Sequence, residues 1–272
     1  MQSLLATLIL TALAVPAAAQ GIDALRADLS FSGLASEGAP LGGGSLRLDG
    51  HYGRGRSGLQ LSAGFEGLEF SDRSLDDLDA AALRLILTRD VAPDVRLGFS
   101  AGITGGDEPT AAHLSLGLHA LWHPEGFRLS ADLIKGLDDR GTNGAIIATI
   151  HAEQDLRPDL TLRGELFRRS TDDEGDDRAV ALLGVRYDFT PQIFGFGDLF
   201  RSSADDLAFV NDGMRLGAGW RWDEGGEVYA ALTGKAGTGL DSLGLTIGIR
   251  LTTGEGLFDT GPLPEFVATG AY

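Results

Sequence analysis

The chain has 272 residues, of which 40 are Gly, nine are Pro and none is Cys, and 43% are hydrophobic. Its formal net charge of −17 argues against a nucleic-acid partner, because a phosphate backbone needs clustered Lys and Arg. The lack of Cys excludes a disulfide framework and thiolate chemistry, while the Gly and Pro content suits many short strands separated by turns.

The first residues have the pattern of a secretory signal peptide. An apolar run from Leu4 to Val15 is followed by Pro16 and three alanines that end at Ala19. The run is too short to cross a bilayer as an anchor helix, which is the alternative interpretation. We therefore expect a signal peptide at 1–19, a folded region at 20–253, and a C-terminal tail or weak final strand at 254–272. No later segment approaches the roughly 20 uninterrupted apolar residues of a membrane helix.

Short turn signals recur along the rest of the chain at intervals of 31 to 35 residues. They fall at Ser57-Gly58, Pro93, Pro124, Pro158, Pro191 and Glu224. Between each two of them lie two segments of alternating apolar and polar residues, joined by a longer acidic or Gly-rich loop. The repeating unit is therefore strand, long loop, strand, short turn.

The alternation predicts fourteen strands. In residues 243–251, for example, every second residue is Leu or Ile, and the residues between them are Gly, Thr or Arg. One face of each strand is thus apolar, and the other is small, polar or arginine-bearing. The expected spans are 22–34, 44–54, 58–66, 80–89, 95–103, 112–122, 127–136, 144–154, 160–169, 179–189, 192–201, 213–222, 227–236 and 241–253.

The lengths of the connections decide between two all-β folds. Alternation alone would also fit a soluble sandwich of two sheets. Here, however, short connections at 54–58, 90–94, 123–126, 155–159, 190–191 and 223–226 alternate with longer ones at 35–43, 67–79, 104–111, 137–143, 170–178, 202–212 and 237–240. This regularity is typical of a transmembrane antiparallel up-and-down β-barrel, and we predict about 14 strands, within a range of 12 to 16.

Aromatic residues are frequent beside the short turns. We expect these to form an interfacial belt at that rim of the barrel: Tyr52, Trp122, Phe127, Phe189, Phe194, Trp220 and Trp222.

The turn spacing, the presequence and one strand end together resemble a known family. The segment Val185-Arg186-Tyr187-Asp188-Phe189-Thr190-Pro191 is an alternating strand that ends in an aromatic residue before a turn. In these features the chain resembles Gram-negative outer-membrane porins over essentially the whole mature region. It departs from them in two respects. Such porins usually have about sixteen or more strands and end in a strand with a terminal aromatic residue, whereas here the last clear strand stops near Thr253.

The resemblance implies a location in the outer membrane of a Gram-negative bacterium. It also implies passive diffusion of small hydrophilic solutes, including ions, without catalysis, cofactor or metal. The partners that it implies are outer-membrane lipid and lipopolysaccharide, the barrel assembly machinery and two further copies in a homotrimer.

Charged residues fall on the face of the strands that a barrel would turn inward. Charges of both signs on a lumen wall retain water and set a transverse field, and the arginines toward the short turns favour anionic solutes. The alternative is that the arginines pair with neighbouring carboxylates and fill the lumen. The expected pore-lining residues are Arg26, Arg47, Arg84, Arg96, Arg128, Arg163, Arg186, Arg215, Arg221, Arg250, Asp28, Asp49, Glu66, Asp132, Glu153, Glu165 and Asp188.

Two other functions remain open at this point. An outer-membrane lipid hydrolase would use a Ser activated by one of five histidines: His51, His113, His119, His123 and His151. His113 and His119 share a face with Ser115, but no short motif fixes a nucleophile, a base and an orienting group together. A structural or ligand-binding barrel without an open pore is the third possibility.

Overall fold

The computed structural model describes residues 23–36, 41–70, 78–106, 113–137, 145–170, 177–204, 209–222, 225–237 and 241–254. The predicted signal peptide and almost all of the predicted tail lie outside this range and stay predictions. The described residues form fourteen strands: β1 (Ala24–Ser36), β2 (Leu41–Arg54), β3 (Ser57–Phe70), β4 (Leu78–Ala92), β5 (Val95–Gly106), β6 (His113–Trp122), β7 (Phe127–Leu137), β8 (Ile146–Arg157), β9 (Leu160–Ser170), β10 (Arg178–Asp188), β11 (Ile193–Ala204), β12 (Phe209–Trp222), β13 (Gly226–Gly237) and β14 (Ser242–Gly254).

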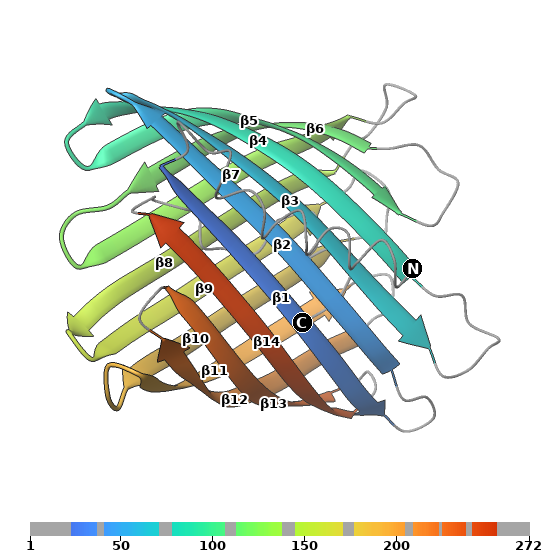
Figure 1. Cartoon of the computed structure of the whole chain (residues 1–272). Coiled ribbons are helices and arrows are strands. Elements are labelled where there is room, and N and C mark those ends of the chain that lie inside the picture. The colour runs from blue at the N-terminus through green and yellow to red at the C-terminus, as the bar shows by residue number, and fades with distance from the viewer. Residues whose placement is uncertain are drawn as a thin grey trace, which may run out of the picture.

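The strands make one closed antiparallel barrel, as predicted (Figure 1). Each strand pairs with its neighbours in the sequence, and β1 closes the barrel by pairing with β14 from Ala24↔Gly254 to Ser36↔Ser242. Closure leaves none of the fourteen described strands with an unpaired edge. A bilayer requires this, because it offers no water to free backbone groups. The described residues contain no helix long and apolar enough to cross a membrane.

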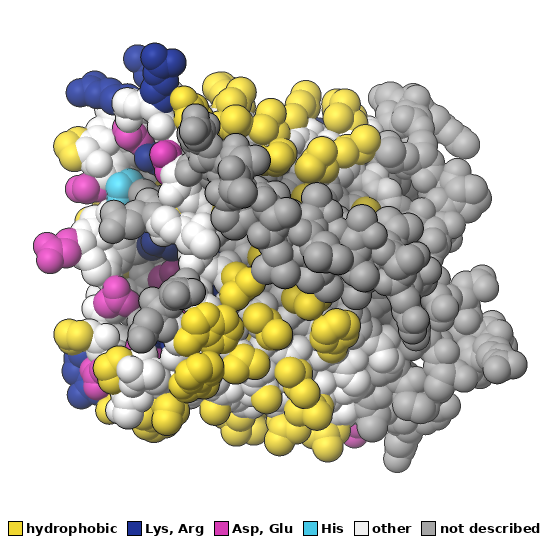
Figure 2. Space-filling view, viewed as in Figure 1, with side chains coloured by type: hydrophobic (Ala, Val, Ile, Leu, Met, Phe, Trp, Pro, Cys, Tyr) yellow, Lys and Arg dark blue, Asp and Glu magenta, His cyan; other side chains and the backbone are white. Residues whose placement is uncertain are grey.

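The outer face of the wall is apolar. On β12, for example, Met214, Leu216 and Trp220 are about half exposed and point outward, while Arg215 and Arg221 between them point inward. Figure 2 shows apolar side chains over the middle of the visible face and charged side chains gathered at the short-turn rim. Such large apolar side chains are stable in this position only against lipid, so the barrel is a transmembrane one.

The short turns lie together at one rim, and the strand ends that precede the longer connections lie at the other (Figure 1). The first turn consists of Gly55 and Arg56. The prediction of a turn at Ser57-Gly58 was wrong, because these residues begin β3. Gly55 takes a φ of 63°, a left-handed conformation that favours glycine and closes a tight hairpin.

Several strands extend further toward the longer connections than the sequence predicted. Residues 41–43, 67–70 and 209–212 were expected in loops, but they belong to β2, β3 and β12. The backbone ladder continues through them, for example at Gly42↔Glu69 and Arg201↔Asp212. Glycine and charged residues there interrupt the apolar alternation without interrupting the backbone hydrogen bonds, so a hydrophobic pattern ends before the strand does.

The outward apolar face gives a direct test of membrane insertion. Leu216 lies near the middle of β12 and is 54% exposed. Replacing it with Arg should lower the free energy of unfolding in lipid vesicles by about 2–4 kcal/mol, because a charge near the bilayer midplane is poorly solvated. Urea titration followed by Trp fluorescence measures this change, and an unchanged stability would contradict the assignment of this face to lipid.

Candidate functional site

The ten arginines expected in the pore all lie on the inner face of the wall, and each makes an ion pair with a carboxylate. Asp28, Asp49 and Asp132 are among their partners, and Glu165 lies 3.4 Å from His151 Nδ1. The side chain of Glu66 lies outside the described part of the structure. The role of this whole set in a pore stays a prediction, but its placement shows that paired charges occupy much of the described inner wall.

A row of alternating positive and negative side chains crosses the seam at which β14 and β1 close the barrel. The register aligns Arg221 with Glu227, Glu227 with Arg250, Arg250 with Asp28, and Asp28 with Arg47. At the seam between β14 and β1, Arg250 Nη2 lies 2.7 Å from Asp28 Oδ2. Opposite charges directly across neighbouring strands stabilise the pairing, so this row holds the first and last strands in register.

Asp49 on β2 forms a second cluster. Its side chain is fully buried, and it accepts hydrogen bonds from Arg26 Nη2 at 2.7 Å, Arg47 Nε at 2.9 Å and Ser62 Oγ at 2.6 Å. Two guanidinium groups therefore share one carboxylate.

The same arrangement recurs across β9, β10, β11 and β12. Asp198 accepts hydrogen bonds from Arg163 Nε at 2.9 Å and from Arg215 Nε at 2.7 Å. Gly184 lies between Arg163 and Asp198 in the register. Arg163 can reach Asp198 across it because glycine has no side chain, and an added Cβ there would collide with both groups. The carboxylate is fully buried, whereas both arginines are 29% exposed. The surface that this cluster presents to the lumen is therefore made of guanidinium groups.

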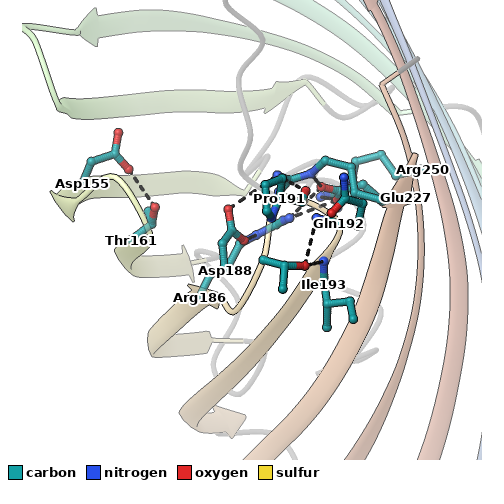
Figure 3. A network of polar contacts seen from close by, with 11 residues as sticks. Asp155, Thr161, Arg186, Asp188, Pro191, Gln192, Ile193, Glu227 and Arg250 are labelled. Carbon is teal, nitrogen blue, oxygen red and sulfur yellow. Dashed lines mark hydrogen bonds and ion pairs between the residues drawn. The ribbon is translucent and has the colours of Figure 1, made fainter. Parts of the chain in front are cut away.

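A further network joins β10, β12, β13 and β14 near the short turns (Figure 3). Arg186 Nη2 lies 2.6 Å from Glu227 Oε1, and its guanidinium covers the ring of Phe194 at 3.8 Å from the centroid. Arg221 also contacts Glu227, at 3.1 Å. Phe194 was expected in the outer aromatic belt, and this was wrong, because its side chain is buried on the inner face beneath Arg186.

The strands β4 to β8 pack their inner side chains more closely. Arg84 on β4 reaches past β5 and β6 to pair with Asp132 on β7. Asp132 also lies 2.9 Å from His119 Nδ1. The three side chains are almost completely buried, so together they brace one side of the barrel from within.

Inner aromatic rings on the other side lie flat against the wall. Phe194, Phe196 and Phe200 of β11 each face a glycine of β12 in the register, and each ring occupies the space that a side chain there would need. Tyr229 of β13 lies over Gly248 of β14 in the same way. Glycine lets the neighbouring ring cover the backbone, which removes the ring from the centre of the lumen.

One part of the inner face is apolar. Ile134, Ile147 and Phe167 form a buried cluster on β7, β8 and β9, and Val180 of β10 packs against it. These positions lie toward the longer connections, whereas the arginine networks near Phe194 lie toward the short turns. The inner wall thus changes in polarity along the barrel.

Three of the five histidines weighed for catalysis lie beside carboxylates. His119 contacts Asp132, and His151 lies between Glu153 and Glu165 at 3.3 and 3.4 Å. His51 Nδ1 lies 3.9 Å from Asp23 Oδ2, and His123 lies next to the short turn after β6. The side chain of His113 is outside the described residues.

Sequence reasoning missed three carboxylates that hold the arginines: Asp90, Asp198 and Glu227. Asp198 lies in a segment where Phe occupies the inner face and glycines interrupt the outer face, so the period-two pattern there does not separate the two faces. Asp90 and Glu227 lie at strand ends, where alternation gives little information. The register places Asp198 directly opposite Arg215, so extending the inner face of β12 across to β11 would have identified it.

No protein-family model matches the sequence, and no curated protein matches it. Solved structures do match over most of the chain. The CymD monoaromatic hydrocarbon channel superposes with a TM-score of 0.56 at 9% identity, covering 86% of this chain and 89% of that one. A mutant of the TodX monoaromatic hydrocarbon channel gives 0.55 at 7% identity, covering 86% and 90%.

A loop-deletion mutant of OmpT, an outer membrane protein of Vibrio cholerae, gives a TM-score of 0.52 at 12% identity, covering 86% of this chain and 100% of that one. At such identities the similarity concerns the fold. The resemblance to porin-like barrels is therefore confirmed at that level, and the chain has the fold of an outer-membrane channel barrel.

Proposed function

We propose that the protein is a channel through which small hydrophilic solutes diffuse passively across the outer membrane, with a preference for anions. The observation that carries the proposal is the pairing of Arg163 and Arg215 with the single carboxylate of Asp198. Because the carboxylate is buried and the two arginines are partly exposed, the group facing water is cationic. The same holds at Asp49, where two guanidinium groups, those of Arg26 and Arg47, pair with a single carboxylate.

The fold supports a location in the outer membrane of a Gram-negative bacterium. There the apolar band would contact outer-membrane lipid and lipopolysaccharide, the barrel assembly machinery would insert the chain, and a homotrimer would share part of the band. Figure 2 is consistent with such a placement, since an apolar band lies next to the charged short-turn rim.

A second candidate is the uptake of apolar solutes. The buried cluster of Ile134, Ile147 and Phe167 favours it, because these residues place an apolar surface inside the barrel. The CymD and TodX structures are described as monoaromatic hydrocarbon channels. We rank this candidate second because paired charges cover a much larger part of the described inner wall.

Reversal potentials in planar bilayers test the first proposal. In a KCl gradient the wild-type channel should pass Cl⁻ more readily than K⁺. Replacing both Arg163 and Arg215 with Gln should lower the ratio of Cl⁻ to K⁺ permeability several-fold, because it leaves the negative charge of Asp198 in place. Arg201→Gln is the matched control, since Arg201 lies on the outer face and should not affect the ratio.

An unchanged ratio in the double variant would contradict anion selection by this cluster. A membrane that stays silent, together with rapid entry of a small aromatic hydrocarbon into protein-containing vesicles, would favour the apolar candidate. Silence in both assays would indicate a structural barrel.

A further inference from the structure

The charged side chains of the inner wall differ in exposure from one side of the barrel to the other. The arginines of β9, β10, β12 and β14 that face the lumen are between 28% and 39% exposed: Arg163, Arg186, Arg215, Arg221 and Arg250. On β4, β6 and β7, by contrast, Arg84, His119 and Asp132 are 4% exposed or less, although Arg128 at the short-turn end of β7 is 27% exposed. The charged cluster around Asp132 is therefore excluded from solvent, whereas the cluster of Arg163 and Arg215 over Asp198 is partly accessible.

The inaccessible side is packed with side chains. Arg84 spans from β4 to β7, and Ser100 and Ser130 nearby are buried as well. Even at Gly117 of β6 no space remains, since an added Cβ would lie 2.7 Å from Ser100 Oγ and 2.9 Å from Ile134 Cγ1. Side chains thus fill the inner face of the wall at these positions.

The accessible side is built differently. Its aromatic rings lie flat over the glycines of β12 and β14, so they do not extend across the lumen. The Arg186 guanidinium lies 3.8 Å from the centroid of the Phe194 ring. Arg186 also pairs with Glu227, which lies three strands away (Figure 3). Long side chains here follow the wall, which keeps the adjacent space open.

We infer that solutes cross the barrel off its axis, along the wall formed by β9 to β14, and that Arg163 and Arg215 over Asp198 are the anion-selecting group on that path. This inference rests on the proposed channel function and adds the location of the path to it. It assigns to the buried charges of β4, β6 and β7, namely Arg84, His119 and Asp132, a supporting role, in which they stabilise the barrel and take no part in selection.

The absence of Cys from the chain makes the inference testable by single cysteine substitutions without background labelling. Thr233 on β13 and Thr246 on β14 are half-buried residues of the accessible wall, and Ser100 and Ser130 are their counterparts on the packed side. Each of the four would be replaced with Cys in the full chain, and heat-modifiable migration would confirm that each barrel is folded. The probes are two membrane-impermeant methanethiosulfonates, one carrying a sulfonate and one a trimethylammonium group.

With the sulfonate reagent, Thr233→Cys and Thr246→Cys should react at least tenfold faster than Ser100→Cys and Ser130→Cys in vesicles, as measured by mass shift. The same two variants should react faster with the sulfonate than with the trimethylammonium reagent, and their modification should reduce the single-channel current. Equal or faster labelling at Ser100 and Ser130 would overturn the inference.

The labelling readout separates this inference from the channel function itself. Mass shift reports which wall is accessible whether or not the barrel conducts. The expected labelling pattern in a protein that carries no current would support the accessible wall and contradict the proposed channel. A protein that conducts current but labels equally on the two walls would support the proposed channel and contradict the inferred path.

Discussion

Replacing Asp132 with Ala should lower the free energy of unfolding by about 3–5 kcal/mol, because it removes one partner of a buried ion pair and leaves the other without compensation. Arg84 and His119 both contact this carboxylate, and all three side chains are nearly inaccessible to solvent. Equilibrium urea unfolding in lipid vesicles measures the loss. We also expect the variant barrel to unfold at a lower temperature than the wild type when samples are heated before gel electrophoresis, as shown by the change in their migration.

Asp212→Ala is the matched control for this prediction. Asp212 pairs with Arg201 at 2.8 Å on the outer face, and both side chains are about two-thirds exposed. Water and salt screen such a pair, so its loss should change stability little. A double replacement of Arg84 and Asp132 with Leu should recover much of the stability lost in Asp132→Ala, because no uncompensated charge remains. If Asp132→Ala is no less stable than Asp212→Ala, the internal brace does not contribute as described.

The strand order and the direction of the side chains were accessible from sequence because a barrel repeats one simple rule. Each strand must alternate between lipid and lumen, and each hairpin must return to the same rim. Residues 243–251 follow this alternation without exception, and all of them belong to β14. Turn positions were predictable for a similar reason, since Pro158 has no N–H to pair in a sheet and lies in the short turn between β8 and β9.

The pairing of the charges was less accessible. Arg186 and Glu227 are 41 residues apart, and Arg84 and Asp132 are 48 residues apart. These contacts depend on the stagger of several strands and on side chains that cross over glycines, and neither is encoded in local alternation. The same reason explains the error at Phe194, where an aromatic residue beside a turn suits an interfacial belt as well as it suits a place under an arginine.

Replacing Gly219 with Val should both destabilise the barrel and reduce its conductance. Gly219 lies beneath the ring of Phe194, and an added Cβ would collide with that ring and lie 2.6 Å from the carbonyl oxygen of Val228. The ring is held from above by Arg186 at 3.8 Å, so it can move only by displacing the arginine from Glu227 toward the lumen. Overpacking of this kind costs about 1–3 kcal/mol. The displaced side chains would also narrow the proposed path, and single-channel recording in planar bilayers measures that effect.

Gly234→Val separates this effect from a general intolerance of β-branched residues. Gly234 lies on the outer face of the neighbouring strand β13 with nothing within 4 Å of an added Cβ, and valine favours strands, so neither stability nor conductance should fall. Adding Phe194→Ala to Gly219→Val should restore part of the conductance, because the ring is then no longer forced inward. If the double variant conducts no better than Gly219→Val alone, the ring does not control access to the wall, and the flat aromatic layer has only a structural role.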